Sequence, residues 1–224
     1  MKFTPNLTKI EWKNGLIYLT LALFLLPSLL VFIPGLSGAQ VLFTGYLISA
    51  ATAGWFLRRY LGKNILVALD HPFATIYLAI LGYLANMALV QMVSYAAYFI
   101  LPDYVNFNNE VIETQMSTDL SLMLATTIVL APIAEECFFR GLLFRGIYDR
   151  RPVLAWVLSV GLFALAHVAG FIGSYSLMEM LVSLVIYIPS GVVLCVTYRR
   201  SGNIISPIIA HASINLMAAL SATR

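Results

Sequence analysis

Two adjacent glutamates stand inside an otherwise apolar stretch of this sequence, in the segment APIAEECFFRGLLFR at residues 131 to 145. A carboxylate near the centre of a bilayer costs about 2.5 to 3.5 kcal/mol on insertion scales, so two together require compensation. Arg140 follows Glu136 by four residues, which is the favourable spacing and order for an ion pair on a helix. The sequence therefore predicts that Glu136 and Arg140 form a buried pair.

That pairing leaves Glu135 available for chemistry. Its side chain points about 100° away from Glu136 around a helix, so it can face the interior of a helix bundle without a cationic partner. A carboxylate in such a place can act as a general base. In the alternative interpretation, both glutamates only form hydrogen bonds with neighbouring helices.

Two histidines also fall within apolar segments. Phe163 and His167 in FALAH are four residues apart and share a helical face, as do His211 and Asn215 in HASIN. A single histidine inside a membrane often makes only an interhelical hydrogen bond. Two histidines, an asparagine and Glu135 together indicate a site.

The elements that carry these residues are predicted to be membrane-spanning helices. The chain is 61% apolar and only 10% charged, against about 25% charged residues in a soluble domain. Since a span needs about 20 apolar residues, the sequence predicts an all-α, polytopic membrane helix bundle with seven transmembrane helices, or eight. The predicted spans cover residues 15 to 34, 38 to 57, 73 to 101, 120 to 144, 152 to 170, 177 to 198 and 204 to 222.

The basic residues predict the topology of these spans. All of them except Arg140 and Arg224 flank alternate crossings, beginning with Lys2, whereas residues 102 to 119 contain four acids and no base. By the positive-inside rule the N-terminus is cytoplasmic, and the acidic connection is an external loop. We expect His71 to lie at the membrane surface, and the net charge of +3 to reflect this bias rather than a nucleic-acid partner.

Several other features are predicted from composition. Cys137 and Cys195 fall inside spans, so we expect packed free thiols and no disulfide framework. The first apolar run is longer than the core of a signal peptide, so we expect a retained helix. Motifs divide the chain into N-terminal transmembrane helices without an assigned motif, 1–117, and a motif-bearing helix core, 118–224.

Helix depth permits the candidate residues to meet. With cytoplasmic helix ends taken at about 145, 152 and 204, Glu135 lies about 15 Å, His167 about 22 Å and His211 about 10 Å from that surface, at about 1.5 Å per residue. Ordinary helix tilt, about 20° on average, can bring these levels together.

EECFFR, FALAH and HASIN resemble, in order, the EExxxR, FxxxH and HxxxN motifs of the CPBP family. This family contains the type II CAAX prenyl proteases and the bacteriocin-processing or self-immunity proteins also called Abi. The resemblance implies a catalytic set of Glu135, His167, His211 and Asn215. It gives supporting positions to Glu136, Arg140 and Phe163.

The resemblance implies hydrolysis of a peptide bond inside the membrane by a water that Glu135 activates with His167, while His211 and Asn215 bind the oxyanion. The family is often labelled a metalloprotease. Glu135, His167 and His211 are also a plausible set of Zn²⁺ ligands, but we favour a mechanism that requires no cofactor. Implied partners are membrane lipid and a peptide or protein substrate, which could be prenylated or a leader peptide.

Two other classes of function stay open. The chain could be a catalytically idle immunity or scaffold protein, or a proton-coupled transporter, since carriers also use buried Glu and His. Many carriers show internal repeats, and we find none here. The small size and the lack of an organelle address favour a multi-pass protein of a prokaryotic plasma membrane.

Overall fold

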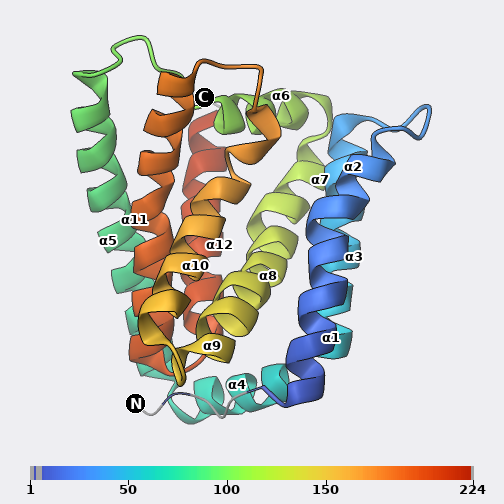
Figure 1. Ribbon diagram of the computed structural model, residues 1–224, viewed down its shortest axis with the longest axis vertical. Helices are drawn as coiled ribbons and strands as arrows, with labels where there is room; N and C mark the ends of the chain where they lie inside the picture. Colours follow the sequence, from blue (N-terminus) through green and yellow to red (C-terminus); the bar gives the residue numbers. More distant parts are fainter. Residues whose placement is uncertain (1–2, 4–6, 223–224) are drawn as a thin grey trace.

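The computed structural model describes residue 3 and residues 7–222, so that Lys2 and Arg224, two of the bases considered above, lie outside the described residues. The described part is an upright bundle of helices (Figure 1) and contains no β-strand. Its α-helices are α1 Lys9–Thr20, α2 Leu26–Leu30, α3 Gly38–Phe56, α4 Arg58–Asp70, α5 Pro72–Tyr98, α6 Phe107–Thr118, α7 Leu120–Leu124, α8 Ala131–Glu136, α9 Gly146–Tyr148, α10 Pro152–Ala166, α11 Leu177–Ser201 and α12 Ile205–Ala222. Three π-helical segments, η1 Leu21–Leu25, η2 Ala125–Leu130 and η3 Cys137–Arg145, and one 3₁₀ turn, η4 Ala169–Phe171, complete the set.

The predicted all-α, polytopic bundle is confirmed, and a helix occupies each of the seven predicted spans. By length and composition, α3 passes as a membrane span only together with α4, to which it is bent by 86°, and α12 is apolar but shorter than a full span. Among the described residues, no further apolar helix corresponds to the possible eighth transmembrane helix. Five other helical stretches are each long and apolar enough to cross a bilayer: Lys9–Leu30, Pro72–Tyr98, Leu120–Tyr148, Pro152–Phe171 and Leu177–Ser201. The bent pair of α3 and α4 would make a sixth span.

Two helices lie across the ends of the bundle, where the sequence predicted only connections. In Figure 1, α4 runs across the bottom and α6 across the top. The prediction of a loop at 102 to 119 was wrong for α6, because Asn106 caps this helix: its side chain accepts a hydrogen bond from the backbone N–H of Asn109. Asparagine favours both turns and helix N-caps, so the Asn-rich segment was misassigned.

The third predicted span is one unbroken helix. α5 covers 27 residues, about 40 Å at about 1.5 Å per residue, so it exceeds the hydrocarbon thickness of about 30 Å. His71 precedes it as the N-cap residue and is exposed. Cys137 and Cys195 are buried free thiols, as expected.

The span that carries the two glutamates lies at the centre of the molecule. In the most apolar window of Leu120–Tyr148, 61% of the residues are buried, against 17% in Lys9–Leu30. α7 and α8 pass through the middle of the bundle, between α10 and the pair α1 and α3 (Figure 1). The largest cluster of buried apolar residues surrounds this span and includes Phe139, Phe144 and Phe163.

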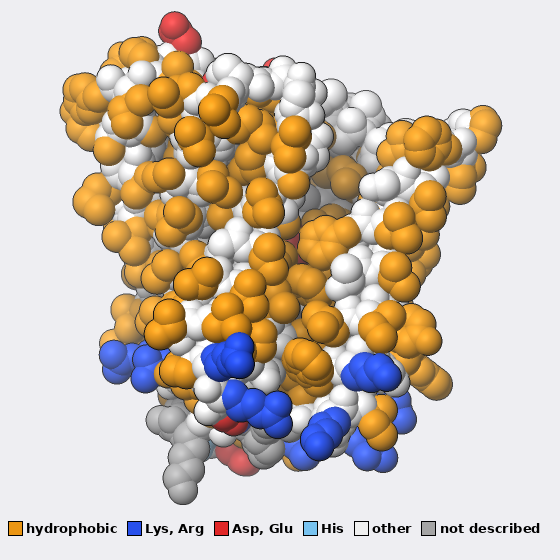
Figure 2. Space-filling view, in the orientation of Figure 1, with side chains coloured by type: hydrophobic (Ala, Val, Ile, Leu, Met, Phe, Trp, Pro, Cys, Tyr) orange, Lys and Arg blue, Asp and Glu red, His pale blue; other side chains and the backbone are white. Residues whose placement is uncertain are grey.

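Side-chain types are arranged in layers along the bundle. On the face drawn in Figure 2, hydrophobic side chains cover most of the height, and Lys and Arg gather near the end where α4 lies. This distribution suits a multi-pass membrane protein, because an apolar belt faces lipid and bases lie at one interface.

Candidate active site

Glu135 and Glu136 end helix α8, between two segments of wider winding. The π-helical η2 precedes α8 and η3 follows it. Pro132, near the start of α8, has no N–H for the carbonyl of residue 128, and such a missing bond is a common cause of irregular turns. Both glutamates are buried, with 7% and 0% of their surface exposed. Segments of π-helix are frequent at functional sites.

The predicted pair of Glu136 and Arg140 is present. Arg140 Nη1 donates to Glu136 Oε1 over 3.0 Å, and both side chains are fully buried. The same oxygen lies 2.8 Å from Nδ1 of His211. Since a carboxylate oxygen only accepts, Nδ1 carries the proton, and Nε2 of a neutral His211 is an acceptor. Glu136 therefore orients His211 as well as balancing Arg140.

Arg140 is held from two further sides. Its Nη2 donates to the carbonyl oxygen of Gly191 on α11 over 3.2 Å. Its guanidinium carbon lies 4.4 Å from the centre of the Phe163 ring, within the range of a cation–π interaction. Phe163 thus contacts the ion pair, which agrees with a supporting position.

Glu135 has a partner that the sequence did not indicate. Tyr46 on α3 donates its hydroxyl to Glu135 Oε1 over 2.7 Å, so this carboxylate has a neutral hydrogen-bond partner. The other oxygen, Oε2, is buried, forms no hydrogen bond with the described residues, and lies 3.9 Å from His211 Nε2. A separation of this size is too long for a hydrogen bond and suits a bridging water.

His167 ends α10 and faces the same cavity as Glu135. Its Nδ1 lies 2.8 Å from the carbonyl oxygen of Phe163, and since a carbonyl only accepts, Nδ1 is protonated and Nε2 of the neutral ring is an acceptor. The cavity has a volume of about 130 Å³. Its walls are formed by Leu23, Phe24, Tyr46, Asn108, Glu135, Phe139, Ala166 and His167.

Asn215 lies one helical turn after His211 on α12. Its side-chain amide donates to the carbonyl oxygen of Thr127 over 2.7 Å. Because the amide nitrogen carries two protons, the second stays available to a ligand. Thr127 belongs to η2, so this bond joins α12 to the span of Glu135.

Two further residues complete the surroundings of His167. The ring of Tyr187 stacks on the imidazole, with the ring centres 4.4 Å apart. The Tyr187 hydroxyl donates to Asn106 Oδ1 over 3.2 Å and accepts from Asn108 Nδ2 over 3.1 Å. Tyr187 and Asn108 stand outside the three motifs, and no spacing in the sequence indicated that Tyr187 would contact His167 or that Asn108 would line the same cavity.

The alternative ligand set for Zn²⁺ does not form in this arrangement. Within residues 7–222 no group of three or more His, Cys, Asp or Glu side chains is placed so that it could hold a metal ion. Glu135 and His211 approach each other, and Nε2 of each histidine is an acceptor, but His167 does not complete a triad with them. The residues therefore do not fit a zinc centre as they stand.

The comparison with known families covers this region. Residues 117–217 match the family model described as Type II CAAX prenyl endopeptidase Rce1-like. This part of the chain is similar to that family. No curated protein and no solved structure matches the chain.

The match to the Rce1-like family model agrees with the resemblance seen in the three motifs, and the matched residues contain all of them. The family description names an endopeptidase, and the match supports a protease of the CAAX type as the kind of function of this region. The match begins one residue before the predicted boundary at 118 and leaves α1 to α5 outside.

Proposed function

We propose that this protein is an intramembrane endopeptidase in which Glu135 activates a water for attack on a peptide bond. The observation that carries the proposal is the placement of Glu135 Oε2, which is buried beside the 130 Å³ cavity and 3.9 Å from His211 Nε2. A water between these two atoms can donate one proton to each, since both are acceptors when His211 is neutral.

In the proposed reaction, one O–H bond of the water breaks and its proton passes to Glu135. The water oxygen forms a bond with the carbonyl carbon of the substrate, and the carbonyl oxygen becomes an oxyanion. The second proton of Asn215 stabilises that charge, while neutral His211, oriented by the bond between its Nδ1 and Glu136, accepts a hydrogen bond from the proton that the attacking oxygen keeps. The carbon–nitrogen bond then breaks, and Glu135 returns the proton to the leaving amine.

His167 has a supporting part in this proposal. His167 lines the cavity and its Nε2 is an acceptor, while the Phe163 carbonyl and the Tyr187 ring fix the imidazole plane. It can therefore accept a proton from the water or orient the water for Glu135. Glu135, His167, His211 and Asn215 are the proposed catalytic set, and no metal is part of the mechanism.

The proposed substrate is a membrane-associated protein or peptide, with a prenylated CAAX-type tail or a leader peptide as the two chemical classes that suit the family. A cavity of 130 Å³ is below the usual 300 to 1,000 Å³ of ligand pockets. It can hold water and one small side chain, so we expect an extended peptide to part the surrounding helices before cleavage.

Comparative proteomics of membrane termini tests this function. Membranes that contain the wild-type protein and membranes that contain Glu135→Gln at equal abundance are compared for new N- and C-termini. We expect a set of termini that requires wild-type protein, and the residues around them define the substrate class. Identical termini in both membranes would reject proteolysis and favour the idle immunity or scaffold protein.

A further inference from the structure

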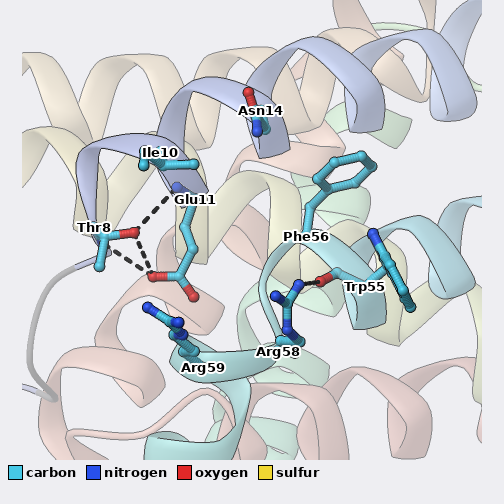
Figure 3. A pocket seen from close by; sticks show the side chains of 8 residues that line it. All are labelled: Thr8, Ile10, Glu11, Asn14, Trp55, Phe56, Arg58 and Arg59. Carbon is cyan, nitrogen blue, oxygen red and sulfur yellow. Dashed lines mark hydrogen bonds between the residues drawn. The ribbon is translucent and has the colours of Figure 1, made fainter.

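A second, larger cavity lies at the end of the bundle where α4 crosses it. Its volume is about 410 Å³, within the usual range of ligand pockets. Figure 3 shows that its walls come from two places in the sequence: the start of α1 and the bend between α3 and α4. The residues are Thr8, Ile10, Glu11, Asn14, Trp55, Phe56, Arg58 and Arg59.

Two guanidinium groups give this cavity a positive charge. Arg58 Nη1 donates to the carbonyl oxygen of Trp55 over 2.9 Å, and its guanidinium carbon lies 5.5 Å from the centre of the Trp55 ring. Arg59 points toward Glu11 in Figure 3 but forms no hydrogen bond or ion pair with any residue that the structure describes. Both arginines are exposed.

The one acid in the cavity is already engaged. Glu11 Oε1 accepts from the backbone N–H of Tyr60 over 3.0 Å, and Oε2 accepts from the backbone and the hydroxyl of Thr8 over 3.1 and 2.8 Å. These bonds cap the N-terminus of α1 and tie it to the start of α4. One carboxylate against two guanidinium groups leaves a net positive charge for a ligand.

The surroundings of the cavity suit the level of phospholipid headgroups in a membrane. α3 runs along the bundle and α4 turns from it by 86° at this point to lie across the end of the bundle (Figure 1). Trp55 and Ile10 beside it are 68% and 73% exposed, and tryptophan is enriched at that level. Basic side chains gather around the same end of the molecule (Figure 2).

We infer that this cavity binds the headgroup of an anionic phospholipid. Guanidinium groups bind phosphate oxygens through paired N–H bonds, and Arg58 and Arg59 are both available for such bonds. The acyl chains would follow the exposed surfaces of Ile10 and Trp55 into the hydrocarbon. This inference concerns a site separate from the proposed protease centre and does not depend on it.

Native mass spectrometry of the purified protein in detergent tests this inference. The probes are dioleoyl phosphatidylglycerol, dioleoyl phosphatidylcholine and inorganic phosphate, each titrated separately. We expect the protein to retain phosphatidylglycerol more tightly than phosphatidylcholine. Replacing both arginines, in Arg58→Gln with Arg59→Gln, should weaken phosphatidylglycerol about 30-fold, which corresponds to about 1 kcal/mol for each charge.

A matched control separates this site from general surface charge. Arg150→Gln with Arg151→Gln removes the same charge from exposed positions outside the cavity, and it should change phosphatidylglycerol binding less than threefold. The single variant Arg59→Gln loses no hydrogen bond or ion pair with the residues that the structure describes, so it tests the site with little change to the fold, and we expect about 5-fold weaker binding.

Three outcomes would overturn the inference. The first is equal retention of both phospholipids by the wild-type protein. The second is an equal loss of binding in the variant pair Arg58 and Arg59 and in the control pair Arg150 and Arg151. The third is binding of inorganic phosphate that displaces phosphatidylglycerol at the same concentration, because the ligand would then be a free phosphate rather than a lipid.

Discussion

Removal of Arg140 should destabilise this protein more than any change to Glu135. Arg140 is fully buried, pairs with Glu136 over 3.0 Å, and donates to the carbonyl of Gly191 over 3.2 Å. Breaking one partner of a buried pair costs about 3 to 5 kcal/mol in soluble proteins, because the other charge is left without compensation. His211 also contacts Glu136 and can offset part of that charge by taking up a proton, so we expect a loss near the lower value for Arg140→Ala.

Thermal unfolding in detergent, followed by tryptophan fluorescence, measures this loss. For a chain of this size about 1 kcal/mol shifts the melting temperature by about 2 to 4 °C, so Arg140→Ala should melt about 6 to 12 °C below the wild type. Glu136→Ala should lower it by a similar amount, since it strands Arg140. Glu135→Gln keeps an acceptor for the Tyr46 hydroxyl and should melt within about 4 °C of the wild type.

A double variant tests whether the two residues act as a pair. Arg140→Met together with Glu136→Gln removes both charges at nearly constant volume, and replacement of a whole buried pair is often close to neutral. The double variant should therefore be more stable than the summed effects of its two single variants. Additive losses, or equal melting temperatures for Arg140→Ala and Glu135→Gln, would refute the pairing.

Three further results are expected. Tyr46→Phe should lower kcat about tenfold in a reporter-peptide assay. The lost hydrogen bond orients the proposed base Glu135, and a hydrogen bond to a charged group is worth about 1.5 to 3 kcal/mol. An unchanged kcat would show that Tyr46 is not part of the site. Gly191→Ala should lower the melting temperature, because the added Cβ would lie 3.2 Å from the Cα of Val160. The control Gly161→Ala should leave the melting temperature unchanged, because its Cβ would meet nothing within 4 Å. Equal effects of the two variants would contradict the close packing of Gly191 against Val160. The purified protein should contain well under one equivalent of zinc, and it should cleave the reporter peptide equally well before and after treatment with a chelator and desalting. The metal-free mechanism would be rejected if the protein contained stoichiometric zinc, lost its activity when the zinc was removed, and regained it when zinc was added back.

The parts of the site that depend on local spacing could be predicted from the sequence. Glu136 and Arg140 pair because residues four apart on a helix are neighbours, and this geometry persists although the segment after Glu136 is π-helical. The bundle could be predicted because uncharged runs of 20 residues have few alternatives in a chain of this composition.

The parts that depend on contacts between distant segments could not be predicted. Tyr46 lies 89 residues before Glu135, and nothing in its neighbourhood differs from an ordinary lipid-facing helix. Tyr187 likewise stacks on His167 from another span. The helices α4 and α6 were missed for a different reason: they are polar or amphipathic, so a search for apolar runs passes over them.

The rate of peptide cleavage by Glu135→Gln tests the central claim most directly. The reporter peptide, taken from a terminus found by the comparative proteomics, is reconstituted in vesicles with purified wild-type or variant protein. A positioned general base typically contributes about 10² to 10⁴-fold to the rate, so Glu135→Gln should cleave at least 100-fold more slowly while its melting temperature stays within about 4 °C of the wild type. Cleavage by Glu135→Gln at the wild-type rate would contradict the role of Glu135 as the base that activates water.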